Sequence, residues 1–291
     1  MPRTSDFFLD CVLYIYSSYE AALENNPLEG GSGFVAAALV GGPSNVHQFY
    51  AVTAAHVVRE AKTPFIRMNK RPGDVEIIEA PATSWEQHPN GDDVSVVPLQ
   101  LNTAELKALG IETTRFVTVD IMETEDIGIG DDVFMLGRFA QHSGSKSQNI
   151  PVARFGNISA MPTEPLLRED GIKQESFLVE CRSVPGHSGA PVFIYKRQLF
   201  EQQGEENFLG QRVVRWDGVK QLMSRSYWLL GIDWCHLQDR ATKANTGMAG
   251  VIPAWKILEL LNSERLVKRR TEVAERIQRD GGDRSAVPNR G

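Results

Sequence analysis

A serine, a histidine and an aspartate in three separate segments could together carry out acyl transfer. The serine is Ser188, in the turn-like stretch 185–191 (Pro-Gly-His-Ser-Gly-Ala-Pro). A serine hydroxyl is a poor nucleophile at neutral pH, so a base and an orienting carboxylate must lie close to it. His56 is the candidate base and Asp93 the candidate carboxylate. The order is His, Asp, Ser, with about 40 and about 95 residues between successive members.

The sequence around each candidate indicates how it is positioned. His56 follows small and β-branched residues (Val52–Ala55), which predict a buried strand that ends in a tight turn. Asp93 begins the alternating pattern Asp-Val-Ser-Val-Val, which is typical of a strand with the acid at its first position. Asp92 directly precedes it and is the competing carboxylate. Each of the three also has a purely structural explanation, so the interpretation depends on finding them together.

Further segments in a matching order point to a known family. Besides the three triad segments, they are Gly31–Val35, Phe134–Gly137, Arg154–Ser159 and Gly247–Pro253. In these segments the chain resembles the trypsin-like (chymotrypsin-fold) serine peptidases, and among them the bacterial trypsin-like and HtrA-like protease domains. The resemblance runs from about Gly31 to Trp255. It favours Asp93 over Asp92, because the family has an apolar residue directly after the acid and Val94 supplies it.

The resemblance implies an all-β fold of two six-stranded antiparallel β-barrels, followed by a C-terminal α-helix. We expect an N-terminal strand and connection in residues 1–30 and a first barrel with the histidine and aspartate in 31–116. A second barrel with the serine would occupy 117–255, and the helix and a tail 256–291. The polar stretch Gln141–Asn149 has no apolar periodicity. We predict a mobile surface loop there that becomes ordered when a partner or substrate binds.

The oxyanion hole follows from the same resemblance. The backbone N–H groups of Gly186 and Ser188 would hold the developing negative charge. Glycine suits the first position, because it can adopt backbone angles that turn its amide inward. His187 lies between them, and adjacent residues generally point apart, so we interpret it as a neighbouring-position variant and not as the base.

The resemblance also assigns substrate-binding residues, namely Arg182, Gly231, Ile232 and Asp233. Arg182 lies six residues before the serine. If it faces the specificity pocket, an acidic substrate side chain is favoured; alternatively it faces solvent or pairs with Glu180 or Asp233. We expect the backbone of Gly231 to pair with an extended substrate.

Two alternatives were weighed against a serine endopeptidase that hydrolyses polypeptides through an acyl-enzyme. An α/β-hydrolase needs its acid and histidine after the serine. The downstream histidine here is His236, only three residues after Asp233, and no alternating strand and helix pattern precedes Ser188. The second alternative is a non-catalytic peptide-binding module on the same fold. Such a module has no need to keep all three triad residues, so the peptidase is favoured.

Composition and cysteine content indicate the class of protein, its partners and its redox compartment. The chain has 291 residues, of which 42% are hydrophobic and 23% charged, within the ordinary globular range. Its net charge of -6 argues against a nucleic-acid partner. The three cysteines form no even framework, and Val57 stands where many secreted relatives have a cysteine, which indicates a reducing, cytoplasmic location. A bridge between Cys181 and Cys235 stays open.

Several partners are predicted to be absent. The histidines show no metal-ligand spacing with the cysteines, so we expect no metal and no cofactor. Asp6 and Asp10 interrupt the apolar N-terminal run, which is too short to span a membrane. The expected partners are a polypeptide substrate and a regulatory protein, since an unregulated cytosolic protease endangers its host.

Overall fold

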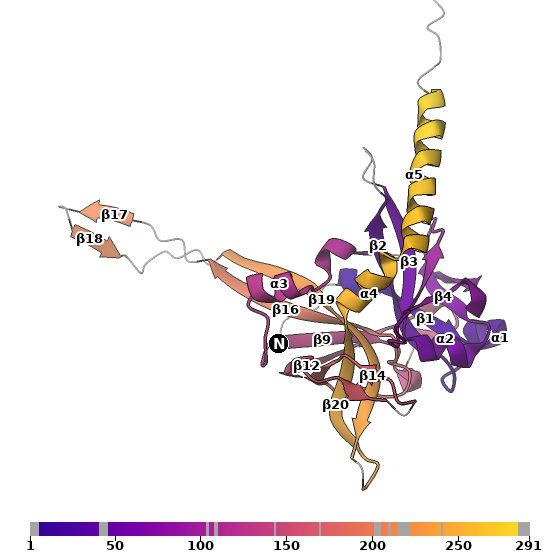
Figure 1. The fold of residues 1–291 in the computed structure, drawn as a ribbon, viewed down its shortest axis with the longest axis horizontal. Helices are drawn as coiled ribbons and strands as arrows, with labels where there is room; N and C mark the ends of the chain where they lie inside the picture. The colour runs from indigo at the N-terminus through magenta and orange to yellow at the C-terminus, as the bar shows by residue number, and fades with distance from the viewer. Residues whose placement is uncertain are drawn as a thin grey trace, which may run out of the picture.

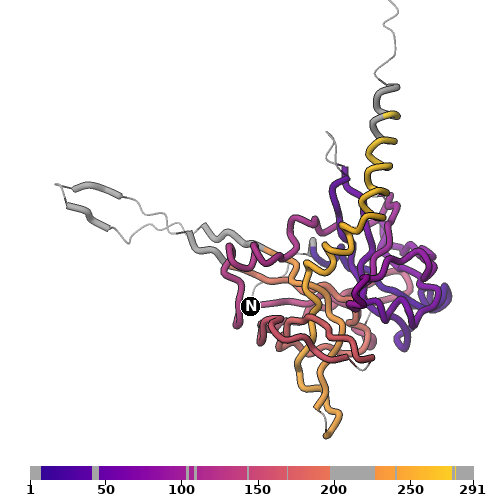
Figure 2. The backbone as a smooth tube through the Cα atoms, in the orientation of Figure 1, coloured from indigo at the N-terminus to yellow at the C-terminus, as the bar shows by residue number. Residues whose placement is uncertain are grey.

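The computed structural model describes residues 6–40, 46–102, 105–107, 110–142, 144–168, 170–200, 205–208, 211–214, 222–239 and 241–284. They form a mostly β protein built from an N-terminal sheet and a C-terminal barrel that lie side by side (Figures 1 and 2). In both figures the indigo and purple strands belong to the sheet, and most of the magenta and orange strands to the barrel.

The N-terminal half is an eight-stranded sheet with the order β5-β4-β1-β2-β3-β7-β6, and β8 pairs with β2. Its strands are β1 (Val12–Tyr16), β2 (Gly31–Leu39), β3 (His47–Thr53), β4 (Phe65–Lys70), β5 (Asp74–Glu79), β6 (Glu86–Gln87), β7 (Ser95–Leu99) and β8 (Ile111–Glu112). The sequence predicted a six-stranded barrel here. Among the described residues the sheet is not closed, because its terminal strands β5 and β6 do not pair with each other.

Strand β1 belongs to the middle of this sheet. It pairs antiparallel with β2 on one edge and β4 on the other, and all five of its side chains are buried. The segment 1–30, predicted as a strand and a connection, therefore contributes a central strand to the same sheet as residues 31–116. Helix α1 (Tyr19–Glu24) follows and is capped by the Ser18 hydroxyl, which accepts from the Ala21 N–H.

The C-terminal half contains the predicted closed six-stranded barrel, in the order β12-β15-β20-β19-β16-β9. Its strands are β9 (Asp132–Gly137), β12 (Val152–Ala160), β15 (Phe177–Glu180), β16 (Pro191–Phe200), β19 (Leu222–Gln238) and β20 (Asn245–Pro253). Three short hairpins accompany it, formed by β10 (Gly144–Ser145) with β11 (Gln148–Asn149), β13 (Leu166–Leu167) with β14 (Lys173–Gln174), and β17 (Glu205–Phe208) with β18 (Gln211–Val214).

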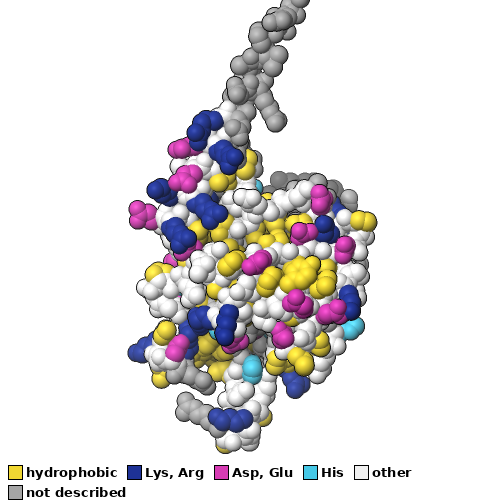
Figure 3. Space-filling view, turned by 90° about the vertical axis from the view of Figure 1, so that its right-hand side faces the viewer, with side chains coloured by type: hydrophobic (Ala, Val, Ile, Leu, Met, Phe, Trp, Pro, Cys, Tyr) yellow, Lys and Arg dark blue, Asp and Glu magenta, His cyan; other side chains and the backbone are white. Residues whose placement is uncertain are grey.

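The helices are few and mostly short. Helix α2 (Ala55–Ala61) follows β3, and α3 (Val119–Thr124) precedes β9. The single C-terminal helix predicted from the sequence is two helices, α4 (Ala254–Leu261) and α5 (Glu264–Arg284). α4 buries Ile257, Leu260 and Leu261 in a core cluster that also contains residues of both sheets. α5 projects from the body, and Figure 3 shows basic and acidic side chains interspersed on its surface.

The loop predicted to be mobile is anchored to the N-terminal sheet. Ser143 lies outside the described residues, but beyond it the loop contacts Arg67 of β4, which is fully buried. The Arg67 guanidinium donates to the carbonyls of Ser145 and Lys146, at 2.8 Å each, and to the Asn149 side chain. Asn149 in turn donates to the Arg67 carbonyl at 2.9 Å. These anchoring contacts are hydrogen bonds, which the pattern of apolar residues does not indicate.

In the part of the chain that the structure describes, no helix is long and apolar enough to cross a membrane.

Candidate active site

The base candidate lies at the start of a short helix. β3 ends at Thr53, Ala54 has extended backbone angles, and α2 begins at Ala55, which makes His56 the second residue of the helix. The tight turn predicted at this point is therefore the first turn of a helix. Ala54 and Ala55 are at most 1% exposed, and their small side chains let the start of the helix pack closely against the neighbouring segments.

His56 and Asp93 form a hydrogen-bonded pair. Nδ1 of His56 lies 2.5 Å from Oδ2 of Asp93, and the His56 backbone N–H donates to Oδ1 at 2.8 Å. Arg59, one helical turn later, also donates to Oδ1, at 3.1 Å. The backbone N–H of Ala55 donates to the Asp93 carbonyl at 3.1 Å. The aspartate thus binds the helix start as well as the imidazole ring, which fixes the orientation of both.

Burial and hydrogen bonding act in opposite directions on this pair. Burial would raise the pKa of the Asp93 carboxyl, but the hydrogen bonds from His56 outweigh burial and lower this pKa below its usual value. Burial would lower the pKa of His56, but the hydrogen bond to Asp93 outweighs burial and raises it. The result is an ionised carboxylate beside an imidazole that accepts a proton more readily than an ordinary histidine.

The competing carboxylate has other partners. Oδ2 of Asp92 lies 2.9 Å from Nδ1 of His88, and its Oδ1 accepts from Nε2 of Gln174 at 2.8 Å. The same glutamine turns its Oε1 to the backbone N–H of Asp93, at 2.8 Å. Asp92 therefore supports the Asp93 backbone through Gln174, while the Asp93 side chain contacts His56.

Ser188 lies in the connection between β15 and β16, directly after a reverse turn. The His187 N–H donates to the Val184 carbonyl at 3.1 Å, and Gly186, the third residue of this turn, has a φ of +97°. A positive φ at the third position characterises a type II turn, which favours proline at the second position and glycine at the third. Pro185 and Gly186 supply both, so the local sequence specifies the turn.

Strand β2 anchors this turn through Ser32, which is fully buried. Its Oγ donates to the Gly186 carbonyl at 2.6 Å and accepts from the Arg138 backbone N–H at 2.8 Å. Its backbone N–H donates to the Ser188 carbonyl at 2.9 Å. The carbonyls on both sides of His187 therefore point toward β2, and the nucleophile loop of the barrel is attached to the N-terminal sheet.

Two amides of the loop remain available. Among the described residues, the backbone N–H groups of Gly186 and Ser188 have no hydrogen-bond partner, whereas those of His187, Gly189 and Ala190 donate to backbone carbonyls. Two unpaired N–H groups two residues apart can hold the negative oxygen of a tetrahedral intermediate. They are the two amides that the sequence assigned to the oxyanion hole.

The histidine between these amides has a structural role. His187 is fully buried, and its Nδ1 lies 3.0 Å from the Val184 carbonyl. Burial lowers its pKa to about 4, so the ring is neutral at physiological pH. His187 therefore packs beneath the turn, in agreement with the interpretation that it is not the base.

His56, Asp93 and Ser188 line one cleft, with a volume of about 910 Å³. The cleft also contains Arg59 and the part of β19 from Trp234 to Gln238. In the described structure no hydrogen bond joins the Ser188 hydroxyl to His56. Such a contact is often long before substrate binds and tightens in the enzyme-substrate complex.

Comparison with models of known protein families identifies the family of this chain. The family model described as "Trypsin-like peptidase domain" matches residues 31–199. The chain belongs to the trypsin-like peptidase family. A search of curated proteins found no match to this chain.

Comparison with solved structures shows the fold of this chain. It is similar to the MamO protease domain (apo form) from Magnetospirillum magneticum, with a TM-score of 0.53 and 16% identity, covering 86% of this chain and 95% of that one. Two further similar structures are Deg5 (TM-score 0.47, 15% identity, 87% and 90% covered) and an inactive serine-to-alanine mutant of Rv3671c from M. tuberculosis H37Rv (0.46, 15%, 87% and 85%). At 16% identity, the likeness to MamO shows the chymotrypsin-like fold alone.

The backbone of Gly231 is not free for a substrate. It pairs with Val192 of β16 on one edge of β19 and with Pro253 of β20 on the other. A side chain at this glycine would collide with the Ile252 carbonyl, at 1.7 Å, so the glycine serves close packing inside the barrel. The strand edge that is open among the described pairings lies further along β19, from Trp234, and faces the cleft that contains Ser188.

The other residues assigned to substrate binding lie at different depths. Ile232 is fully buried in the barrel, and Asp233 is 1% exposed and accepts a hydrogen bond from the Ser183 hydroxyl at 2.8 Å. Burial raises the pKa of Asp233 to about 7. Arg182 is exposed and lines a pocket separate from the cleft. Among the described residues it forms no ion pair, so neither Glu180 nor Asp233 neutralises it.

All three cysteines of the chain are free, so no bridge joins Cys181 to Cys235. Cys235 lines the cleft, and burial raises the pKa of its thiol to about 12, which keeps it protonated. Within the described ranges, no group of three or more metal-ligating side chains lies close enough to hold an ion.

Sequence reasoning missed Ser32 and Gln174 as supports of the site. Ser32 stands in the Gly31–Val35 segment that helped to carry the resemblance, but nothing in its neighbourhood indicates a contact with a loop more than 150 residues away. Gln174 has no local signal either, since its role depends on the packing of the β14 hairpin against the Asp93 loop.

Proposed function

We propose that this protein is a serine endopeptidase that hydrolyses peptide bonds in polypeptides through an acyl-enzyme. One observation carries the proposal: the His56–Asp93 pair lines the same cleft as Ser188, which lies in a loop with two backbone amides that are unpaired among the described residues. Membership of the trypsin-like peptidase family supports peptidase activity in general terms.

In the first half of the reaction Ser188 Oγ attacks the carbonyl carbon of the scissile peptide bond, and its proton passes to Nε2 of His56. Asp93 accepts the hydrogen bond from Nδ1–H and stabilises the imidazolium. The N–H groups of Gly186 and Ser188 hold the oxyanion. His56 then gives the proton to the leaving amine, the C–N bond breaks, and an ester to Ser188 remains.

In the second half a water molecule takes the place of the leaving amine. It gives a proton to His56 and attacks the ester carbonyl, and the same two amides hold the oxyanion. The bond to Ser188 Oγ then breaks and the serine takes back a proton from His56. The products are a carboxylic acid and the free enzyme, with no other reactant consumed.

The open edge of β19 supports a polypeptide as substrate. Among the described pairings, residues 234–238 have no strand on the side where β16 has ended, and they line the cleft beside Ser188. An extended chain can add there as a further strand, with main-chain hydrogen bonds giving affinity. Leu166 and Leu167 also line the cleft, and Leu167 is 73% exposed. We propose that these leucines contact apolar substrate side chains.

A fluorophosphonate probe tests the proposal without knowledge of the substrate. The wild-type chain should be labelled covalently at Ser188, and Ser188→Ala should not be labelled. Ser183→Ala is the matched control: it removes a buried hydroxyl five residues away that contacts Asp233 and not the triad pair, so labelling should persist.

Absence of labelling in wild-type protein that is folded by circular dichroism would contradict the peptidase and favour the peptide-binding module. Labelling that persists in Ser188→Ala would show a different nucleophile. Regulation by a protein partner and a cytoplasmic location stay predictions from the sequence.

A further inference from the structure

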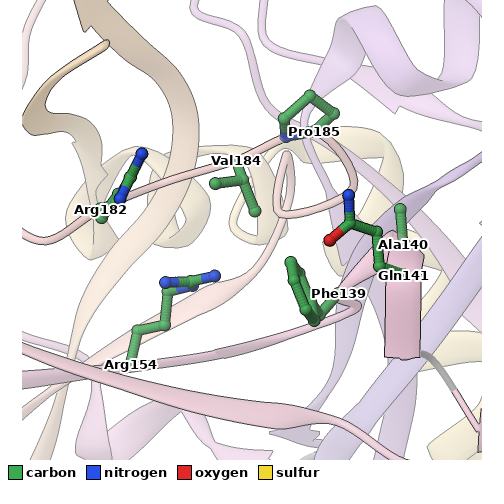
Figure 4. Close-up of a pocket in the computed structure, with 7 residues that line it drawn as sticks. All are labelled: Phe139, Ala140, Gln141, Arg154, Arg182, Val184 and Pro185. Atoms are coloured by element: carbon green, nitrogen blue, oxygen red, sulfur yellow. The ribbon is translucent and has the colours of Figure 1, made fainter.

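A second pocket lies beside the reverse turn formed by residues 184–187 and outside the cleft that contains Ser188. It has a volume of about 410 Å³ and is lined by residues 139–141, Arg154, Arg182, Val184 and Pro185. It shares no lining residue with the cleft that contains Ser188. Figure 4 shows Arg154 below, Val184 and Pro185 above, Arg182 at one end and Phe139 with its neighbours at the other.

The pocket contains two positive charges that no described acidic side chain neutralises. Neither Arg154 of β12 nor Arg182, just after β15, has a carboxylate partner among the described residues. In the described structure, Nε of Arg154 is buried and has no hydrogen-bond partner. The Arg154 guanidinium lies 5.3 Å from the centre of the Phe139 ring, which holds it in place. A buried donor without an acceptor is costly, and an anion in the pocket would satisfy it.

The same pocket contacts the turn that shapes the oxyanion hole. Val184 and Pro185 are the first two residues of that turn, and Gly186 is the third. Val184 also contacts Nδ1 of the buried His187 through its backbone, while Nε2 of His187 has no hydrogen-bond partner in the described structure. An occupant of the pocket therefore lies against the segment that sets the direction of the Gly186 amide.

We propose that this pocket binds an oxyanion group, a carboxylate or a phosphate, held between the guanidinium groups of Arg154 and Arg182. Guanidinium groups suit such ligands, because their planar N–H donors match two oxygens of a carboxylate or phosphate. Arg182 and Pro185 are exposed, so the group can enter from solvent. The bound anion restrains the Val184-Pro185 segment and so favours the turn that aims the Gly186 amide into the cleft. This effect on the nucleophile rests on the proposed peptidase function; the binding does not.

Calorimetric titration of the full chain tests the binding, with Ser188→Ala as the protein so that no turnover occurs. The probes are inorganic phosphate and N-acetyl-glycylglycine, with the amide of the same dipeptide as a neutral control. We expect saturable binding of at least one anion and none of the amide. Arg154→Gln and Arg182→Gln should each weaken it about tenfold or more. Arg269→Gln removes the same charge from an exposed position of α5 and should change nothing.

Each result has one meaning for the proposal. Tighter binding of phosphate than of the carboxylate assigns a phosphate-bearing ligand, and the reverse assigns a carboxylate. Absence of saturable binding of both anions overturns the proposal, as does equal binding by wild type and by both pocket variants that circular dichroism shows to be folded. Equal weakening by Arg269→Gln would reveal a general charge effect and also overturn it.

The effect on the turn has a separate readout. With Ser188 intact, the saturating anion should raise the rate of fluorophosphonate labelling, and Arg154→Gln should abolish this rise while leaving labelling without anion unchanged. If the anion binds but the labelling rate of a reactive enzyme stays constant, the coupling to the turn is wrong. If wild type binds the anion and is never labelled, the proposed function fails and the binding site stands.

Discussion

Replacing Asp93 by asparagine should abolish most of the activity while the fold is retained. Oδ1 of Asp93 accepts from the His56 backbone N–H and from Arg59, at 2.8 and 3.1 Å, so an asparagine will keep its carbonyl oxygen there. Its amide NH2 then takes the place of Oδ2, beside Nδ1 of His56. An NH2 group donates and cannot accept, which forces the imidazole proton onto Nε2. Nε2 of His56, the nitrogen that would receive the proton of Ser188, then has no free lone pair.

The expected loss is large because the wrong tautomer removes general-base catalysis altogether. Equivalent changes in Ser-His-Asp triads lower the rate about 10⁴-fold, which corresponds to roughly 5.5 kcal/mol of activation free energy. The assay is the second-order rate constant for fluorophosphonate labelling of Ser188 at neutral pH, which needs no knowledge of the substrate. Circular dichroism and thermal unfolding of the same samples report whether the variant is folded.

Asp92→Asn is the matched control, because it makes the same chemical change one residue earlier. The new side chain keeps a carbonyl oxygen for Gln174, which continues to hold the Asp93 backbone N–H. The labelling rate should stay within about tenfold of wild type, since no contact to His56 is lost. The assignment is refuted if Asp93→Asn, when folded, keeps more than about a tenth of the wild-type rate, against the 10⁴-fold loss expected. It is equally refuted if the control loses as much as Asp93→Asn.

Three further outcomes are expected. Ser32→Ala should lower the labelling rate about tenfold, the equivalent of one hydrogen bond of roughly 1.4 kcal/mol, because the Gly186 carbonyl loses its donor. An unchanged rate would mean that Ser32 does not position the turn. The labelling rate should rise with pH through a midpoint above the ordinary histidine pKa, because only neutral His56 accepts the proton and Asp93 raises the pKa of His56. A midpoint below the ordinary histidine pKa would contradict the pairing of His56 with Asp93. Arg67→Met should lower the free energy of unfolding by about 3 kcal/mol, because it leaves Asn149 and two loop carbonyls without their donor. A loss under about 0.5 kcal/mol in urea unfolding would show that the anchored loop contributes little to stability.

The pH dependence of stability follows from the same pair, with opposite signs for its two members. The pKa of His56 is raised in the folded protein, so its contribution is fully present below the unfolded pKa and is lost as pH rises through the folded pKa. The pKa of Asp93 is lowered, so its contribution is present above the unfolded value and is lost as pH falls through the folded one. Both are fully present together only between the unfolded pKa of the carboxyl and that of the imidazole.

The features that could be predicted from the sequence are those set by local chemistry or by order along the chain. Pro185 and Gly186 specify a type II turn by themselves, and Val94 after Asp93 matched the family pattern. The closed C-terminal barrel was predicted from the resemblance and is confirmed. The closed N-terminal barrel was not found among the described residues, because closure depends on whether terminal strands such as β5 and β6 reach each other, and strand patterns do not contain that information.

The contacts that could not be predicted are polar bonds between distant segments. The resemblance predicted that the backbone of Gly231 pairs with an extended substrate, but its partner is β20 of the same barrel. Arg67 and Gln174 act through hydrogen bonds to residues about 80 positions away, and no periodicity of apolar residues reports such a bond.

These polar bonds make the geometry of the nucleophile a property of both halves of the molecule. Ser32 of the N-terminal sheet holds the Gly186 carbonyl and also accepts from the backbone of Arg138, at the end of β9 in the barrel. The buried Arg138 guanidinium in turn donates to the Asn26 carbonyl and to the Tyr16 hydroxyl. The barrel that contains Ser188 therefore lacks, by itself, both the triad pair and the strand that orients its oxyanion turn. The site is therefore complete only when the two halves are docked, because hydrogen bonds that join the halves also position the turn.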